Sequence, residues 1–169
     1  YKDSGFRYLD YSFYNVVMKP NHPFMTDNWK EQILEAKAAA DELGFSFVQA
    51  HSPCCEIWGE GSEEGVFATI RSVEACGMLG IHNMVVHSGC TPEYKYPQDR
   101  LAYFKANEPF FRALIPMMEK YDVSILFETV GYHARTENVI GIINHFASAS
   151  IGVSWNVRGT YFDAGETAE

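Results

Sequence analysis

Short apolar runs alternate with amphipathic segments along the whole chain. The apolar runs are rich in aromatic and β-branched residues, which is typical of buried β-strands. Between them, apolar residues recur at helical intervals, and glycines stand where helices would end. The runs that predict strands cover residues 6–13, 45–53, 82–89, 123–131 and 151–156. The pattern therefore indicates successive strand–helix units.

The segments between these runs carry recognisable helix signals. Asn28 and Glu31 have the spacing of a capping box at the start of the first predicted helix, and Gly44 is expected to end it. The longer helix before the run 123–131 contains Pro116, which removes a backbone donor and should kink or restart the helix. Each predicted helix thus joins two consecutive predicted strands.

Alternating strands and helices predict an α/β fold, in which a parallel sheet is covered by helices. The sheet is either doubly wound or closed into a barrel. Neither of the two glycine-rich phosphate-binding signatures follows any predicted strand, so a nucleotide-binding doubly wound sheet has little support. No linker or low-complexity segment divides the chain. We therefore expect residues 1–169 to form a single domain, and a closed barrel is favoured over a doubly wound sheet.

Within four of these runs, we take the strand itself to end at a polar residue: His51, His87, Glu128 and Asn156. In a barrel, the carboxyl ends of the strands converge on one mouth, where such enzymes place their chemistry. A carboxylate at the end of an apolar strand needs a cation or a reacting hydroxyl to offset its loss of water. These residues are therefore candidate metal ligands or proton-transfer groups. The structural alternative is a hydrogen-bonded histidine, or a glutamate paired with a lysine or arginine.

Other residues are weaker candidates for contacts with a ligand. Phe13 at a strand end and Trp58 in the glycine-rich loop EIWGEGSEEG suit stacking on a sugar, although a solvated loop also accounts for Trp58. Arg158 could meet a phosphate, or it could simply be an exposed loop residue. The remaining histidines are expected at surface or loop positions: His22, His82, His133 and His145. Of these, His133, two residues after Gly131, is the one best placed to reach a ligand.

The composition excludes several classes of protein. With 22 acidic and 13 basic residues, the formal net charge of the 169-residue chain is -9, which argues against nucleic-acid binding. No run approaches the roughly 18 apolar residues of a membrane span, and the first residues lack a signal-peptide layout. The cysteines form no C-x-x-C pair, so we expect reduced thiols in a cytoplasmic protein: Cys54, Cys55, Cys76 and Cys90.

Five motifs together resemble a known family in their order and spacing. They are GFRYLDYSF, FVQAHSP, NMVVHSG, ILFETVG and IGVSWNVRGTYFDAGE. The family is that of the sugar phosphate isomerases and epimerases with a xylose-isomerase-like TIM barrel, which is related to endonuclease IV. The resemblance spans nearly the whole chain. It implies a (β/α)8 barrel represented here by about five βα units, strands 2 to 6, with a divalent metal and a small-molecule sugar substrate.

The resemblance also implies roles for individual residues. Glu128 matches the fifth-strand glutamate, which in the family binds the metal and acts as the acid or base. His51 and His87 match histidines that line the pocket and that bind additional zinc in the endonuclease branch. Asn156 and Gly159 stand where the family usually has Asp and His, so the site keeps a neutral oxygen ligand and loses a charge.

The expected site therefore has two parts. Glu128, Asn156 and His87 are the expected ligands of a divalent metal, Mn, Mg, Co or Zn, with Glu128 also catalytic. The expected substrate contacts are His51, His87, Trp58, Phe13 and Arg158. Because the first strand and the last two of a complete barrel would be absent, we expect either a longer natural chain or association into a homo-oligomer.

Three functions follow from these expectations. The first is a metal-dependent isomerase or epimerase that acts on a sugar or polyol, phosphorylated or not, by proton transfer through an enediolate. The second is a non-catalytic sugar-binding barrel that has lost its metal, for which Asn156 and Gly159 are the evidence. The third is a zinc phosphodiesterase acting on abasic DNA, against which the negative charge weighs. A membrane role is not expected.

Overall fold

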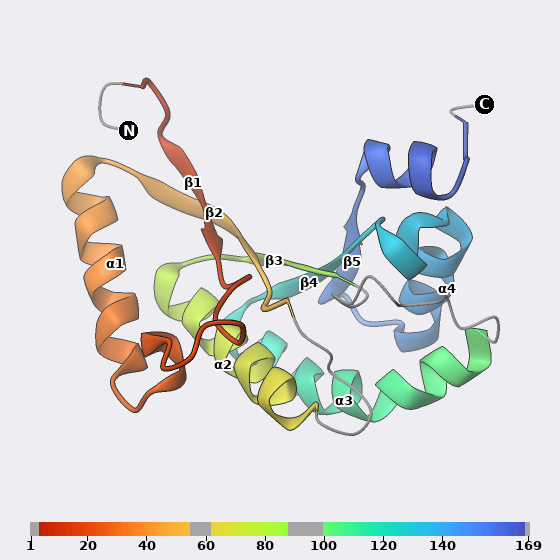
Figure 1. The fold of residues 1–169 in the computed structure, drawn as a ribbon, viewed down its shortest axis with the longest axis horizontal. Coiled ribbons are helices and arrows are strands. Elements are labelled where there is room, and N and C mark those ends of the chain that lie inside the picture. Colours follow the sequence, from red (N-terminus) through yellow and green to blue (C-terminus); the bar gives the residue numbers. More distant parts are fainter. Residues whose placement is uncertain (1–3, 55–61, 88–99, 168–169) are drawn as a thin grey trace.

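A five-stranded parallel sheet forms the centre of the computed structural model, which describes residues 4–54, 62–87 and 100–167. The strands lie in chain order across the sheet, as Figure 1 shows. Their bounds are β1 (Tyr8–Ser12), β2 (Ser46–His51), β3 (Asn83–Val86), β4 (Ser124–Glu128) and β5 (Ile151–Ser154). All five predicted strands are therefore confirmed, and the sheet is that of a partial barrel.

In the described part of the chain, four helices line one side of the curved sheet, in the order in which they follow the strands (Figure 1). Short helical turns occur at three further points of the described chain. The helices are α1 (Trp29–Leu43), α2 (Glu63–Leu79), α3 (Arg100–Tyr121) and α4 (Thr136–Phe146), and the turns are η1 (Pro23–Met25), η2 (Gly131–Ala134) and η3 (Gly159–Asp163). No helix in these described ranges is long and apolar enough to cross a membrane.

The helix ends agree with the sequence signals in part. Gly44 and Gly80 end α1 and α2 in the left-handed conformation, each with φ of 73°. Asn28 precedes α1, but its side chain makes no capping hydrogen bond, so the predicted capping box is wrong. Its backbone, with φ -88° and ψ 12°, departs from the extended conformation that aims a capping oxygen at the helix.

Helix α3 continues through its prolines. Pro109 and Pro116 both lie within it, so the helix does not restart at Pro116. The packing of α3 against the sheet accounts for this, because Phe111, Leu114 and Met118 are almost completely buried. Tertiary packing can thus offset the backbone hydrogen bonds that proline removes.

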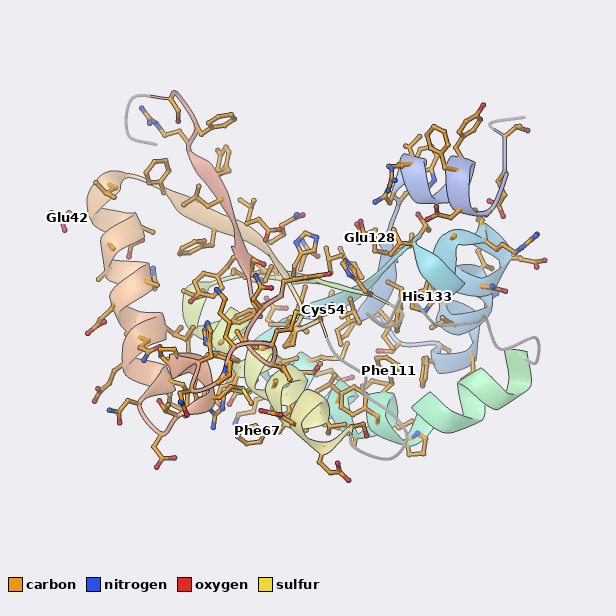
Figure 2. All side chains as sticks on the ribbon, viewed as in Figure 1. Glu42, Cys54, Phe67, Phe111, Glu128 and His133 are labelled. Atoms are coloured by element: carbon orange, nitrogen blue, oxygen red, sulfur yellow. The ribbon has the colours of Figure 1, made fainter. Side chains whose placement is uncertain are left out.

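The hydrophobic core lies between the helices and the sheet, and the opposite face of the sheet is open. Among the described residues, Ile33, Met84 and Phe127 have at most 1% of their surface exposed. Along β1, Leu9 and Tyr11 are partly buried, whereas their neighbours in the strand are exposed. Figure 2 shows Phe111 on the helix side and Glu128 on the open side. The polar strand ends therefore face away from the core.

The pairing of β1 with β2 is irregular at one point. Leu9 pairs with Phe47, but the next residue, Asp10, pairs with Gln49, so the register skips Val48. Such a bulge re-aims side chains, because neighbouring residues of a strand face opposite sides. Asp10 consequently shares the open face with Gln49 and His51.

The cysteines differ from the prediction. Cys54 is disulfide-bonded rather than reduced, whereas Cys76 is a buried free thiol whose pKa is raised by burial. Cys55 and Cys90 lie outside the described residues. The prediction was wrong for Cys54 because the absence of a C-x-x-C pair does not exclude other pairings.

Candidate functional site

Three of the predicted site residues converge on the open face of the sheet: His51, His87 and Glu128. His51 ends β2, Glu128 ends β4, and His87 directly follows β3. Each offers one ligand atom, and these three atoms all lie within 4.8 Å of one another. Because adjacent parallel strands end at the same edge of the sheet, residues far apart in sequence meet there. Two imidazoles and one carboxylate could together hold a divalent metal ion.

The contact between His87 and Glu128 is the shortest in this cluster. His87 Nε2 lies 2.6 Å from Glu128 Oε2, and the two side chains are 23% and 15% exposed. The close contact with His87 is the main cause that lowers the pKa of Glu128, and burial opposes it. The Asn156 hydrogen bond and the charges of His87 and His51 lower this pKa further. Glu128 is therefore an ionised carboxylate at neutral pH.

Asn156 holds the other oxygen of Glu128. Its Nδ2 donates to Glu128 Oε1 at 2.8 Å, and its Oδ1 accepts from the backbone N–H of Gly159 at 3.1 Å. Both partners demand the same orientation of the amide, because a carboxylate only accepts and an N–H only donates. The Asn156 oxygen therefore accepts from Gly159, and its nitrogen faces Glu128. His51, not Asn156, is the third residue whose ligand atom lies near those of His87 and Glu128.

Gly159 is required by the close approach of η3 to the end of β4. A Cβ atom at this position would run into the backbone carbonyl oxygen of Thr129. The same region is tied together by Thr129 Oγ1, which accepts from the Asn156 N–H at 2.7 Å. No histidine fits at Gly159 without a backbone movement.

His51 is held by Asp10, an acidic residue that the sequence pattern did not indicate. Its Nδ1 lies 2.7 Å from Asp10 Oδ2, and Gln49 Nε2 donates to the same oxygen at 2.8 Å. The ring of His51 lies edge-on to that of His87, with centroids 5.8 Å apart. The only signal of Asp10 in the sequence is a carboxylate within the aromatic strand YLDYS.

The remaining predicted contacts are not brought together at this cluster. Phe13 is 0% exposed and packs against Tyr11 and Phe24, so it supports the core instead of facing a substrate. Arg158 is exposed just before η3. Trp58 lies outside the described residues. The prediction for Phe13 is corrected because the strand alternation turns its side chain toward the helices.

His133 is buried, contrary to the expected surface or loop position. It lies in η2, has 0% of its surface exposed, and sits edge-on to Phe127 with centroids 5.0 Å apart. Burial, followed by the charge of His87, lowers the pKa of His133 to about 3. Figure 2 shows it close to the end of β4 that carries Glu128. A neutral imidazole therefore packs directly behind the site.

This buried imidazole should make the stability of the protein pH-dependent. Below about pH 6.5 the unfolded chain protonates His133, whereas the folded chain does so only near its pKa of about 3. The free energy of unfolding should thus decrease as the pH is lowered through this window, by up to about 1.4 kcal/mol per pH unit. Chemical denaturation at several pH values should show a smaller slope for His133→Gln, and an unchanged slope for the exposed His82→Gln. Equal slopes for His133→Gln and the unmodified protein would contradict the prediction.

The fold and the site together define a class of protein. Parallel strands in chain order, helices on one side and polar groups at the carboxyl ends are the features of a TIM barrel. The profile of the Xylose isomerase-like TIM barrel family matches residues 2–167. The chain belongs to this family.

Solved structures with the same fold include sugar epimerases. D-psicose 3-epimerase from Clostridium cellulolyticum, solved with D-tagatose, is 13% identical, with a TM-score of 0.72 over 98% of this chain and 58% of its own. A Xylose isomerase-like TIM barrel protein from Mycobacterium smegmatis, solved with magnesium, is 14% identical, with a TM-score of 0.67 over 89% of this chain and 51% of its own.

A third similar structure is the IolI protein with a bound zinc atom, 16% identical, with a TM-score of 0.65 over 90% of this chain and 53% of its own. The chain spans a little over half the length of these proteins. At such low identities the likeness concerns the fold. Among curated proteins no match to the sequence was found.

Proposed function

We propose that the chain supplies the metal-binding part of an isomerase or epimerase that acts on a sugar or polyol. The observation that carries the proposal is the convergence of His51, His87 and Glu128, whose ligand atoms lie within 4.8 Å of one another. Neutral imidazoles and a carboxylate suit Zn²⁺, Mn²⁺ or Co²⁺ better than Mg²⁺, which prefers oxygen ligands. The names of similar structures, among them D-psicose 3-epimerase and L-ribulose 3-epimerase, support the reaction class.

Glu128 is the group that we assign to proton transfer. Its carboxylate takes the proton from the carbon next to the sugar carbonyl, and the electrons of that C–H bond move into an enediolate. Return of the proton to the neighbouring carbon, with transfer of the hydroxyl proton to the former carbonyl oxygen, completes an isomerisation. Return to the opposite side of the same carbon completes an epimerisation and needs a second proton donor across the sugar. The chemistry that a bound divalent ion supplies is polarisation of the carbonyl and the adjacent hydroxyl.

The contacts that His87 and Asn156 make with Glu128 suit this role. His87 contacts one oxygen and Asn156 the other, so the carboxylate is fixed from both sides. A fixed carboxylate loses little entropy when it meets the substrate. Polar groups on the same face, such as Asp10 and Gln49, can accept from or donate to sugar hydroxyls. The net charge of -9 favours a neutral sugar, and Arg158 is the candidate contact if the substrate carries a phosphate.

Metal content and proton exchange test the proposal together. Protein purified without chelator should contain about one equivalent of Zn, Mn or Co by plasma mass spectrometry. In D₂O, NMR should show deuterium entering a ketose at the carbon next to the carbonyl. Exchange should stop after chelation and return after the metal is restored. Metal-free protein, or exchange that ignores the chelator, would refute the metal-dependent reaction.

A non-catalytic sugar-binding barrel is the second candidate, favoured by one observation. Asn156 uses its amide to hold Glu128 and Gly159, so the fourth of the polar strand ends is not directed at a metal. This role predicts sugar binding, by calorimetry, that is the same with and without chelator. A zinc phosphodiesterase would use the same three ligands, and salt-sensitive binding of abasic DNA would favour it instead.

A further inference from the structure

We propose that Asp10 is a positioning residue that sets the tautomer and direction of His51 for metal binding. The inference rests on the proposed function, because it takes His51 to be a metal ligand. It concerns a residue that does not itself belong to the three-ligand cluster.

The contact between the two side chains determines which nitrogen of His51 is free. His51 Nδ1 lies 2.7 Å from Asp10 Oδ2. An ionised carboxylate only accepts hydrogen bonds, so Nδ1 must carry a proton. In the neutral imidazole the lone pair then belongs to Nε2. Because Nδ1 is engaged, Nε2 is the nitrogen left to serve as the ligand atom.

Asp10 is itself held in place. Gln49 Nε2 donates to the same Oδ2 atom at 2.8 Å. Gln49 is the register partner of Asp10 in the neighbouring strand, so the two side chains stand next to each other on one face. Gln49 therefore orients the Asp10 carboxylate, which also contacts the Nδ1 atom of His51. This is the arrangement in which an outer carboxylate fixes the ring of a metal-binding histidine.

The register shift makes the contact possible. If the pairing of Leu9 with Phe47 continued without a bulge, Asp10 would pair with Val48, the residue that alternates with Gln49. Val48 and Gln49 are neighbours in a strand, and their side chains face opposite sides of a regular sheet. The bulge therefore brings Asp10 into register with the residues of the open face. Bulges are common next to active sites for this reason.

A second histidine–aspartate pair of the described chain lies on the surface, away from the three candidate ligands. His82 Nδ1 lies 3.0 Å from Asp122 Oδ2, with side chains 67% and 89% exposed. The Asp10 and His51 side chains are 31% and 30% exposed, and the pair lies beside two further ligand candidates. An exposed pair contributes little by itself. Asp122→Asn is thus a matched control that removes the same charge from a surface pair.

Two measurements test the role of Asp10, both on the purified protein. The first is the ¹⁵N NMR signature of the His51 ring in metal-free protein at about pH 8, above the ordinary histidine pKa. We expect a proton on Nδ1 in the unmodified protein and in Asp122→Asn, and a shift toward the other tautomer in Asp10→Ala. An Nε2 proton in the unmodified protein, or no change in Asp10→Ala, would overturn the inference.

The second measurement is the affinity for Co²⁺, titrated by its absorption spectrum. Asp10→Asn should bind Co²⁺ roughly 10- to 100-fold more weakly than the unmodified protein. Asp122→Asn should bind it unchanged. Unaltered affinity in Asp10→Asn would refute this inference alone. If the unmodified protein bound no metal, the proposed function would fail, and the tautomer measurement would still report whether Asp10 orients His51.

Discussion

Glu128→Gln should abolish stable metal binding and slow proton transfer by roughly 10²- to 10⁴-fold. The substitution keeps the shape of the side chain and removes its charge and its basicity. It also disturbs both contacts of the carboxylate, because His87 contacts one oxygen and the Asn156 Nδ2 donates to the other. A glutamine can offer an oxygen to only one of them and must turn its NH₂ group toward the other. The lost acceptor should destabilise the fold by about 1–3 kcal/mol.

The experiment compares metal content, exchange rate and thermal unfolding in two variants. Glu74→Gln is the control, because Glu74 forms an ion pair with Lys30 on the helix side of the molecule. It should retain the metal and the rate. If Glu128→Gln bound metal and exchanged protons as the unmodified protein does, Glu128 would be neither ligand nor base. The loss of metal with full exchange would leave Glu128 a ligand but not the base, and it would refute the metal-dependent reaction.

Gly159→Ala should destabilise the protein by about 3 kcal/mol. The added Cβ would collide with the backbone carbonyl oxygen of Thr129, which cannot move without disturbing the end of β4. Overpacking against a rigid neighbour commonly costs about 1–3 kcal/mol, and a backbone obstacle places this site at the upper end. For a domain of this size, a loss of about 3 kcal/mol lowers the melting temperature by roughly 6–12 °C.

Gly152→Ala provides the matched control. The obstacle there is the tip of the flexible Leu126 side chain, 2.9 Å from the added Cβ. Because Leu126 can adopt another rotamer, we expect a clearly smaller loss of stability. Calorimetric unfolding of the two variants should therefore separate them. An equal or smaller effect at Gly159 would show that η3 is not tightly packed against β4.

The strand-end pattern was sufficient to find most of the candidate site. Strands that end in His51 and Glu128, and one followed directly by His87, could be recognised because buried parallel strands are continuous apolar runs. Their convergence follows from the parallel topology alone, which requires no side-chain detail. The family resemblance agreed with the same three residues.

The residues that the sequence did not reveal depend on local geometry. Asp10 joins the site through a one-residue bulge, and alternation counted along β1 or β2 cannot locate a bulge. The role of Asn156 depends on which way its amide is turned, and the backbone N–H of Gly159 decides this. His133 is buried by packing between η2 and the end of β4. Such features follow from the assembled tertiary structure rather than from the periodicity of one segment.

The candidate site draws on the whole width of the described sheet. Asp10 comes from β1, His51 from β2, His87 from the end of β3, Glu128 from β4 and Asn156 from the turn after β5. The distances among these groups are therefore set by the curvature of the sheet, and a flatter sheet would separate them. An ion bound by the three ligands would link the ends of three neighbouring strands. Its binding energy would then stabilise the sheet as a whole, and metal affinity would report how tightly the sheet is curved.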